Sequence, residues 1–89
     1  MLKNPVAIVT GGSRGVGAAT VKILSANGWN VLITCSSSIE AAEIVAAECT
    51  SKTAEVIAIK ANVANDGDCI LTVEEAINKW GRVDALVNN

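Results

Sequence analysis

Residues 6–17 read Val-Ala-Ile-Val-Thr-Gly-Gly-Ser-Arg-Gly-Val-Gly, an apolar run followed by a glycine-rich segment. A continuous apolar run without alternating polar residues is typical of a strand buried on both faces of a parallel sheet. Glycine tolerates positive φ and leaves space beside the backbone, so the segment can turn tightly from this strand into a helix. Backbone N–H groups at such a turn can bind phosphate, and we therefore expect a phosphate-binding turn here.

The pattern of an apolar run followed by an amphipathic segment recurs along the chain. We expect strands at residues 6–9, 31–34, 55–59 and 83–87, and helices at residues 15–27, after the serine run 36–38, and between Asn65 and Gly81. Short connections between alternating strands and helices imply right-handed crossovers and a parallel sheet with helices on both faces. The predicted fold class is α/β, a Rossmann-type doubly wound parallel sheet with strand order 3-2-1-4.

Each predicted helix has apolar residues at helical spacing, and these should face the sheet. They are Val16, Ala19, Thr20, Ile23 and Leu24 in the first helix, Ile39, Ala42, Val45, Ala46 and Cys49 in the second, and Ile70, Val73, Ala76, Ile77 and Trp80 in the third. Ser37 and Glu40 have the spacing of a capping box for the second helix. Asn65 is expected to cap the third helix, with Asp66 and Asp68 in its first turn.

The composition excludes several classes of protein. The net charge is −2 and the basic residues are scattered, so no basic stripe is available for nucleic acid. No apolar run approaches the roughly 20 residues of a membrane span. Lys3 and Pro5 precede a run of strand length rather than a longer hydrophobic segment with a cleavage site, so no secretory signal is expected and the predicted location is cytoplasmic. Three cysteines and no histidine predict neither a disulfide framework nor a Cys/His zinc site.

The run at residues 83–87 is expected at an open edge of the sheet. Parallel sheets are normally continued until their apolar strands are covered, so the sequence predicts an incomplete fold. We expect residues 1–89 to be the N-terminal part of a single Rossmann domain, separated from the remainder by truncation, cleavage or separate supply. No linker or low-complexity segment indicates an internal domain boundary.

The spacing of the glycines distinguishes between phosphate-binding turns. Gly12 and Gly17 have the separation found in P-loop nucleotide triphosphatases, but that loop needs Lys-Ser or Lys-Thr directly after its last glycine to reach the phosphates and magnesium. Ala18-Ala19 stand there instead, so this class is excluded. The ordinary G-x-G-x-x-G spacing of dinucleotide-binding proteins is not met either.

Residues 10–17, Thr-Gly-Gly-Ser-Arg-Gly-Val-Gly, resemble the T-G-x-x-x-G-x-G motif of the short-chain dehydrogenase/reductase family. Asn62-Val63 resembles the (Asp/Asn)-Val segment that flanks the adenine in this family, and Asn88-Asn89 resembles the start of its N-N-A-G motif. The three motifs occur in the family's order and extend over nearly the whole chain. Within the family, the glycine loop and the serine-rich end of the second strand are most similar to 3-oxoacyl-[acyl-carrier-protein] reductases.

The resemblance implies a bound dinucleotide and a role for each motif. The pyrophosphate would lie over the start of the first helix, on Gly11, Gly12, Ser13, Arg14, Gly15, Val16 and Gly17. By resemblance, Asn62 and Val63 hold the adenine, Asn89 lies near the nicotinamide ribose, and Asn88 braces the sheet. Thr10 is expected to make hydrogen bonds within the turn.

The end of the second strand indicates which dinucleotide is bound. NAD enzymes place Asp or Glu about 20 residues past the loop to bind the ribose 2′-OH, and this carboxylate would repel a 2′-phosphate. Cys35 stands there, followed by Ser36 and Ser37, so no carboxylate opposes a 2′-phosphate. The charged guanidinium of Arg14 can donate hydrogen bonds to that phosphate, and the two serine hydroxyls can complete its binding. We therefore predict NADP(H).

The resemblance also implies the reaction of the complete protein, which is hydride transfer between NADP(H) and a carbonyl or alcohol substrate. In the family a Tyr acts as acid and base with the help of a Lys, a Ser and an Asn, and all of these lie beyond the fourth strand. This chain has no tyrosine, so we expect no catalytic residue in it and no activity from its 89 residues alone. Family members commonly form homo-oligomers. The alternative function is a non-catalytic dinucleotide-binding module or an interaction fragment.

Overall fold

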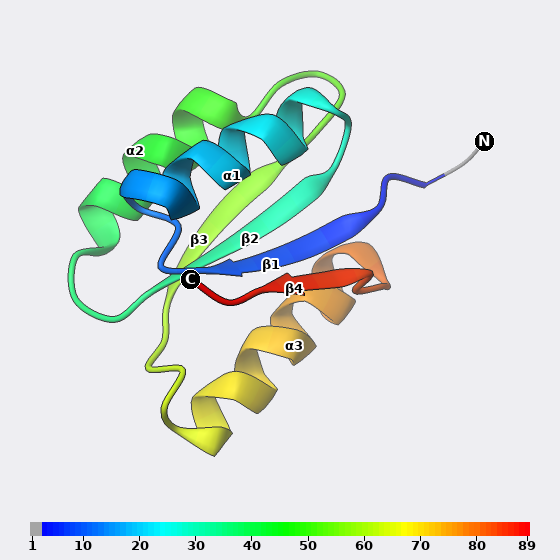
Figure 1. The fold of residues 1–89 in the computed structure, drawn as a ribbon. Coiled ribbons are helices and arrows are strands. Elements are labelled where there is room, and N and C mark those ends of the chain that lie inside the picture. Colours follow the sequence, from blue (N-terminus) through cyan, green and yellow to red (C-terminus); the bar gives the residue numbers. More distant parts are fainter. Residues whose placement is uncertain (1–2) are drawn as a thin grey trace.

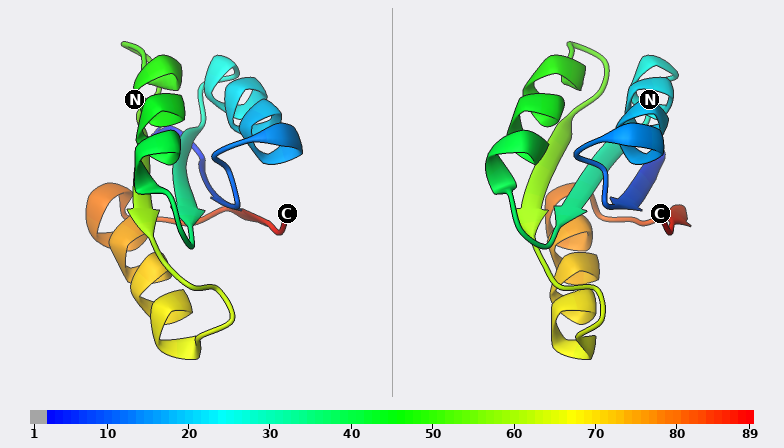
Figure 2. Two further views of the ribbon diagram at one scale, coloured as in Figure 1. Left: turned by 90° about the vertical axis from the view of Figure 1, so that its left-hand side faces the viewer. Right: turned by 60° about the vertical axis from the view of Figure 1, so that its left-hand side comes forward.

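The computed structural model describes residues 3–89, which form a parallel sheet with helices on both faces (Figure 1). The strands are β1 (Val6–Thr10), β2 (Asn30–Cys35), β3 (Val56–Lys60) and β4 (Ala85–Val87), and the helices are α1 (Gly15–Ala26), α2 (Ile39–Cys49) and α3 (Asp66–Trp80). The strand order is β3-β2-β1-β4. Helices α1 and α2 cover one face and α3 covers the other (Figure 2). The predicted fold class and strand order are confirmed.

Strand β1 lies inside the sheet, between β2 and β4. In the parallel register Val6 pairs with Asn30 and Thr10 with Thr34 on one side, while Val9 pairs with Val87 on the other. Every residue of β1 is buried because helices cover both faces of the sheet at this strand. This explains the continuous apolar run in the sequence.

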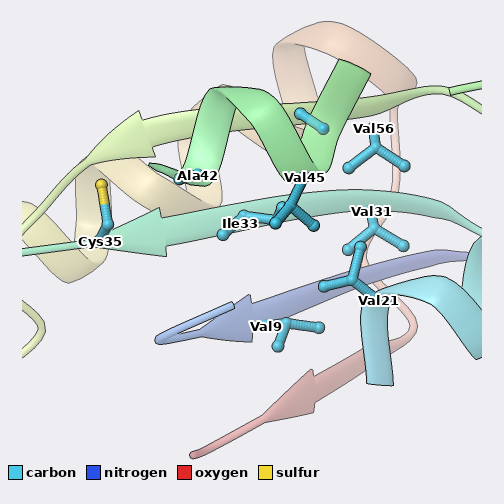
Figure 3. Packing of buried hydrophobic residues seen from close by; sticks show 9 residues of the cluster. Val9, Val21, Val31, Ile33, Cys35, Ala42, Val45 and Val56 are labelled. Carbon is cyan, nitrogen blue, oxygen red and sulfur yellow. The ribbon is translucent and has the colours of Figure 1, made fainter. Parts of the chain in front are cut away.

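Two hydrophobic cores lie on the two faces of the sheet. The core under α1 and α2 consists of Val9, Val21, Val31, Ile33, Cys35, Ala42, Val45, Ala46 and Val56. Figure 3 shows Val21 of α1 and Val45 of α2 packed on the aliphatic side chains of the sheet. The core under α3 consists of Val6, Ile8, Leu32 and Ala76. Trp29 packs against the first core, and Trp80 packs against the second, as predicted for Trp80.

Helix α2 buries the face that its sequence predicts, whereas of the predicted core residues of α1 only Leu24, which is partly buried, packs against the core. The buried residues of α1 are Gly17, Val21 and Ser25, which are four residues apart, whereas Val16 and Ile23 are 74% and 64% exposed. The reason is that the helix begins against the glycine turn: a Cβ at Gly17 would lie 2.3 Å from the Gly11 carbonyl oxygen. This contact fixes the rotation of α1, and small side chains let the helix lie close to the sheet.

Helix α3 is also rotated from its predicted orientation. Its buried positions are Thr72 and Ala76, and the Thr72 hydroxyl donates to the Asp68 carbonyl at 2.7 Å, which allows a polar side chain to be buried. Only one flank of the predicted stripe, with Ala76 and Trp80, packs against the sheet. The other predicted core residues of this helix are 44–59% exposed: Ile70, Val73 and Ile77.

The helix ends follow the prediction for α3 and differ for α2. The Asn65 side chain accepts a hydrogen bond from the Asp68 N–H at 3.0 Å, and Gly81 ends α3 with φ +79°. The predicted capping box at Ser37 and Glu40 is wrong because α2 begins one residue later, with Ser38 as the N-cap. The Ser38 hydroxyl contacts the Glu40 carboxylate at 3.4 Å instead of capping a backbone N–H.

No helix within residues 3–89 is long and apolar enough to cross a membrane.

Asp84 joins the start of β4 to β1. Its carboxylate accepts from the Val6 N–H at 2.8 Å, and its own N–H donates to the Val6 carbonyl at 2.8 Å. The Arg82 guanidinium binds the same carboxylate through two nitrogens, at 2.8 and 2.7 Å. The hydrogen bonds from Arg82 and then from Val6 hold the pKa of Asp84 below its ordinary value of 3.8. The carboxylate form of Asp84 therefore stabilises the edge of the sheet.

We predict an acid-sensitive contribution of Asp84 to stability. A pKa lowered by folding stabilises the protein above the ordinary pKa, and this stabilisation is lost as the pH falls through the lowered value. Urea denaturation of the protein and of Asp84→Asn should differ most near about pH 6, and the difference should shrink below about pH 4. A difference that stays constant over this range would contradict the prediction.

A second prediction concerns the core under α3. Leu32 is fully buried, so Leu32→Ala should lower the free energy of unfolding by about 2–5 kcal/mol. The matched control is Leu71→Ala on α3, where the side chain is 61% exposed and the expected change is within about 0.5 kcal/mol. Equal losses in the two variants, measured by urea denaturation, would disprove the assigned packing.

Candidate cofactor site at the carboxyl edge of the sheet

The glycine turn between β1 and α1 lies at the carboxyl edge of the sheet. Gly11 and Gly15 adopt φ values of +65° and +61°, in the left-handed region that favours glycine. Apart from the chain neighbours and the backbone of the first turns of α1, no heavy atom lies within 4 Å of a Cβ placed at Gly15. The backbone at Gly15 therefore faces open space, where a ligand can approach it.

Gly12 and Gly17 serve the packing of the protein itself. A Cβ at Gly12 would lie 2.7 Å from Cγ2 of Ile33, and a Cβ at Gly17 would lie 2.3 Å from the Gly11 oxygen. Both glycines are buried. They act on a ligand only indirectly, because they allow the turn to lie against β2 and against the start of α1.

The first turn of α1 borders the open space at Gly15. Arg14 is the N-cap residue in extended conformation, and its side chain makes no capping hydrogen bond. The first turn contains no acidic residue, so the positive end of the helix dipole has no carboxylate beside it within α1. Arg14 and Val16 are exposed and Ser13 is half-buried, which places these predicted residues on the rim of the site.

Thr10 and Asn89 tie the turn to the end of β4. The Thr10 hydroxyl accepts from the Asn89 N–H at 3.0 Å and donates to the Val87 carbonyl at 3.4 Å. The Asn89 side-chain amide donates to the Gly11 carbonyl at 3.1 Å. Figure 1 shows the C-terminus beside the end of β1. The predicted hydrogen-bonding role of Thr10 is confirmed, and Asn89 holds one side of the turn.

A cavity of about 170 Å³ opens beside this turn at the carboxyl ends of β1 and β2. It is lined by Thr10, Gly11, Thr34, Cys35, Ser36, Ala61, Val63 and Asn89. Four predicted cofactor residues thus meet at one cavity: Gly11, Ser36, Val63 and Asn89. Thr34 and Ala61 were missed, although each lies at the carboxyl end of a strand or directly after one, where ligand sites of such sheets occur.

Outside the glycine turn, two predicted residues do not line this cavity. Ser37 is exposed in the connection between β2 and α2. Asn62 is also exposed, and its side-chain oxygen accepts from the Ala64 N–H at 3.0 Å. Its own N–H donates to the Asp68 carboxylate at 2.7 Å. Asp68 therefore contacts the predicted adenine segment, a role that sequence reasoning did not assign to it.

Cys35 occupies the lining position at the end of β2. Its thiol is buried and lies 3.6 Å from the Ile59 carbonyl oxygen, to which it donates. Burial raises the pKa of the Cys35 thiol above its ordinary value of 9.0, against the opposing charge of Lys60. The thiol is therefore neutral at neutral pH. No carboxylate side chain lines the described cavity, consistent with the absence of Asp or Glu at this point of the sequence.

The parallel sheet, the strand order and the glycine turn at the carboxyl edge define a Rossmann-type α/β protein. A sequence profile of the short chain dehydrogenase family matches residues 5–89. The chain therefore belongs to this family.

Relatives of known name agree with this assignment. A 3-oxoacyl-[acyl-carrier-protein] reductase from Synechocystis is 43% identical over 88 residues, which are 99% of this chain and 36% of that protein. An enzyme of the same name from Staphylococcus epidermidis is 40% identical over 86 residues, which are 97% of this chain and 35% of that protein. The chain thus spans about a third of the length of the curated relatives it matches.

Solved structures of this family have the same arrangement of strands and helices. A short-chain dehydrogenase/reductase from Serratia marcescens superposes with a TM-score of 0.89 at 43% identity, covering 99% of this chain and 36% of that chain. A Sinorhizobium meliloti protein described in the same family gives a TM-score of 0.91 at 38% identity, covering 100% of this chain and 41% of that one. The resemblance predicted from the three motifs is confirmed.

The packing of the turn generates a prediction about its glycines. Gly17→Ala places a Cβ against a backbone carbonyl that cannot rotate away, so we expect a loss of about 3 kcal/mol or more in the free energy of unfolding. Gly15→Ala meets no neighbour and should lose only about 1–2 kcal/mol, the usual cost of a left-handed conformation. Urea denaturation measures both losses. A Gly17→Ala variant as stable as the parent would rule out the close approach of α1 to the turn.

Proposed function

We propose that this chain binds NADP(H) at the carboxyl edge of its sheet. In this proposal residues 1–89 are the N-terminal part of a single NADP(H)-binding Rossmann domain. The complete protein transfers a hydride between NADP(H) and a carbonyl or alcohol substrate. The observation that carries the proposal is the glycine turn with open space at Gly15, bordered by the first turn of α1. Membership of the short chain dehydrogenase family supports it.

The proposed pose follows the chemistry of the site. The pyrophosphate lies over the turn, where backbone N–H groups of Ser13 to Val16 and the helix dipole attract an anion. The adenosine enters the cavity that Ser36 and Val63 line. The nicotinamide ribose lies toward Asn89, whose side chain is already oriented by its hydrogen bond to Gly11. Gly12 and Gly17 contribute by holding the turn in place.

The preference for NADP(H) over NAD(H) is supported by the charges around the cavity. Cys35 presents a neutral thiol at the position where a carboxylate would repel a 2′-phosphate. Arg14 is exposed and makes no capping hydrogen bond, so its charged guanidinium can donate hydrogen bonds to the 2′-phosphate. The hydroxyls of Ser36 and Ser37 follow directly after Cys35 and supply further donors.

The chemical step is assigned to residues outside this chain. The reductases named above are about three times longer, and the chain contains neither tyrosine nor histidine to transfer a proton in the hydride reaction. We propose that the remainder of the protein supplies these residues, the substrate pocket and the contacts of a homo-oligomer. The names of the relatives favour a 3-oxoacyl substrate. The cytoplasmic location expected from the sequence stays a prediction.

Arg14 provides the test of cofactor choice. Calorimetric titration should show tighter binding of NADPH than of NADH, and Arg14→Ala should weaken NADPH binding about tenfold or more, the worth of a hydrogen bond to a charged group. Binding of NADH should change little. Lys22→Ala, which removes a positive charge from an exposed position of the same helix, serves as the control. Equal affinity for the two dinucleotides would disprove the NADP(H) assignment.

The activity of the isolated chain separates the proposed function from the alternative of a purely binding module. The 89 residues alone should bind NADPH but should not oxidise it in the presence of a 3-oxoacyl thioester, as followed by NADPH absorbance. Addition of a polypeptide with the missing family motifs should restore turnover if the complete protein is a reductase. Turnover by this chain alone would contradict the assignment of the chemical step to residues outside it. A complex with the added polypeptide that binds NADPH and the thioester without turnover would favour the binding module.

A further inference from the structure

The loop between β3 and α3 is held by an unusual variant of a helix cap. Asn65 is the N-cap residue of α3, and its side chain accepts from the N–H of Asp68, the third helical residue. In an ordinary capping box the side chain of this third residue would accept from the N-cap N–H in return. Here the Asn65 N–H donates to the Asn62 carbonyl at 2.9 Å, so the cap does not need the Asp68 carboxylate.

The Asp68 carboxylate instead accepts from the Asn62 N–H, six residues earlier, at 2.7 Å. This short hydrogen bond to a charged acceptor belongs to the strong class. The neighbouring Cys69 thiol donates to the Val63 carbonyl at 3.1 Å, and the Asn62 side chain accepts from the Ala64 N–H at 3.0 Å. Residues 62–65 are thus bonded to the first turn of α3 or to one another along their whole length.

This loop is part of the wall of the proposed cofactor site. Val63 lines the carboxyl-edge cavity together with Ser36, yet its side chain is 47% exposed and little packing holds it in place. Backbone hydrogen bonds therefore have to define its position. Asp68 is the one charged side chain among the described hydrogen bonds of residues 62–65 to α3.

We propose that Asp68 is a positioning residue for the adenine side of the dinucleotide. Its carboxylate fixes the backbone of Asn62 through the hydrogen bond to the Asn62 N–H. This bond thereby positions the Val63 side chain against the adenine ring and orients the Asn62 side chain toward the edge of the ring. The inference rests on the proposed function. It adds that α3, on the opposite face of the sheet from α1, takes part in recognition of the base.

Three variants test this role. Asp68→Ala should weaken NADP⁺ binding about tenfold and should reduce the preference for NADP⁺ over its deamino analogue, in which hypoxanthine replaces adenine. Asp68→Asn keeps an acceptor oxygen and should recover most of both properties. Asp66→Ala is the matched control, because Asp66 lies in the same first turn but makes no hydrogen bond to residues 62–65. It should bind both dinucleotides as the parent does.

Hydrogen exchange of the ligand-free protein gives a readout independent of binding. The Asn62 N–H should exchange faster in Asp68→Ala and at the parent rate in Asp66→Ala, while amides of β1 and β2 stay protected in both. Unchanged affinity and base preference in Asp68→Ala, or equal losses in Asp66→Ala, would overturn the inference and leave the proposed function standing. A parent protein that binds NADP⁺ at no concentration would overturn both.

Discussion

The contact of Gly17 with the carbonyl of Gly11 sets the geometry of this protein. A Cβ at Gly17 would lie 2.3 Å from that oxygen. Because glycine has no Cβ, the first turn of α1 can lie directly on the glycine turn. The contact sets the rotation of α1, so that Val21 faces the core and Val16 faces solvent. It also leaves the backbone at Gly15 open beside an uncapped helix start. Packing and the candidate phosphate site thus have the same cause.

The parallel sheet brings the other parts of the site to this point. Segments that follow β1, β2 and β3 meet at the carboxyl edge because all strands run in one direction. Thr10 and Asn89, 79 residues apart, are joined there by a hydrogen bond. Helix α3 reaches the same edge from the opposite face through Asp68 and Asn62. Both faces of the sheet therefore contribute to the candidate site.

The strands and the family could be predicted from the sequence, because buried parallel strands are continuous apolar runs and the three motifs lie at strand ends. The helix rotations could not. Periodicity marked Ile23 and Ile70 as core residues, but close contacts of Gly17 and Ala76 turn them outward. Asp68 was recognised only as a charge in the first turn of a helix, because its bond to Asn62 depends on the fold of the loop. The cofactor roles of the site residues stay predictions.

The proposed binding of a dinucleotide with its pyrophosphate on the glycine turn can be tested by an NMR titration of the ¹⁵N-labelled protein with NADP⁺, because each backbone N–H reports separately. We expect the largest shifts at residues 11–17, further shifts at Ser36 and Val63, and little change at the amino ends of the strands. Amides of the glycine turn that stay unmoved at saturating NADP⁺ would contradict this proposal.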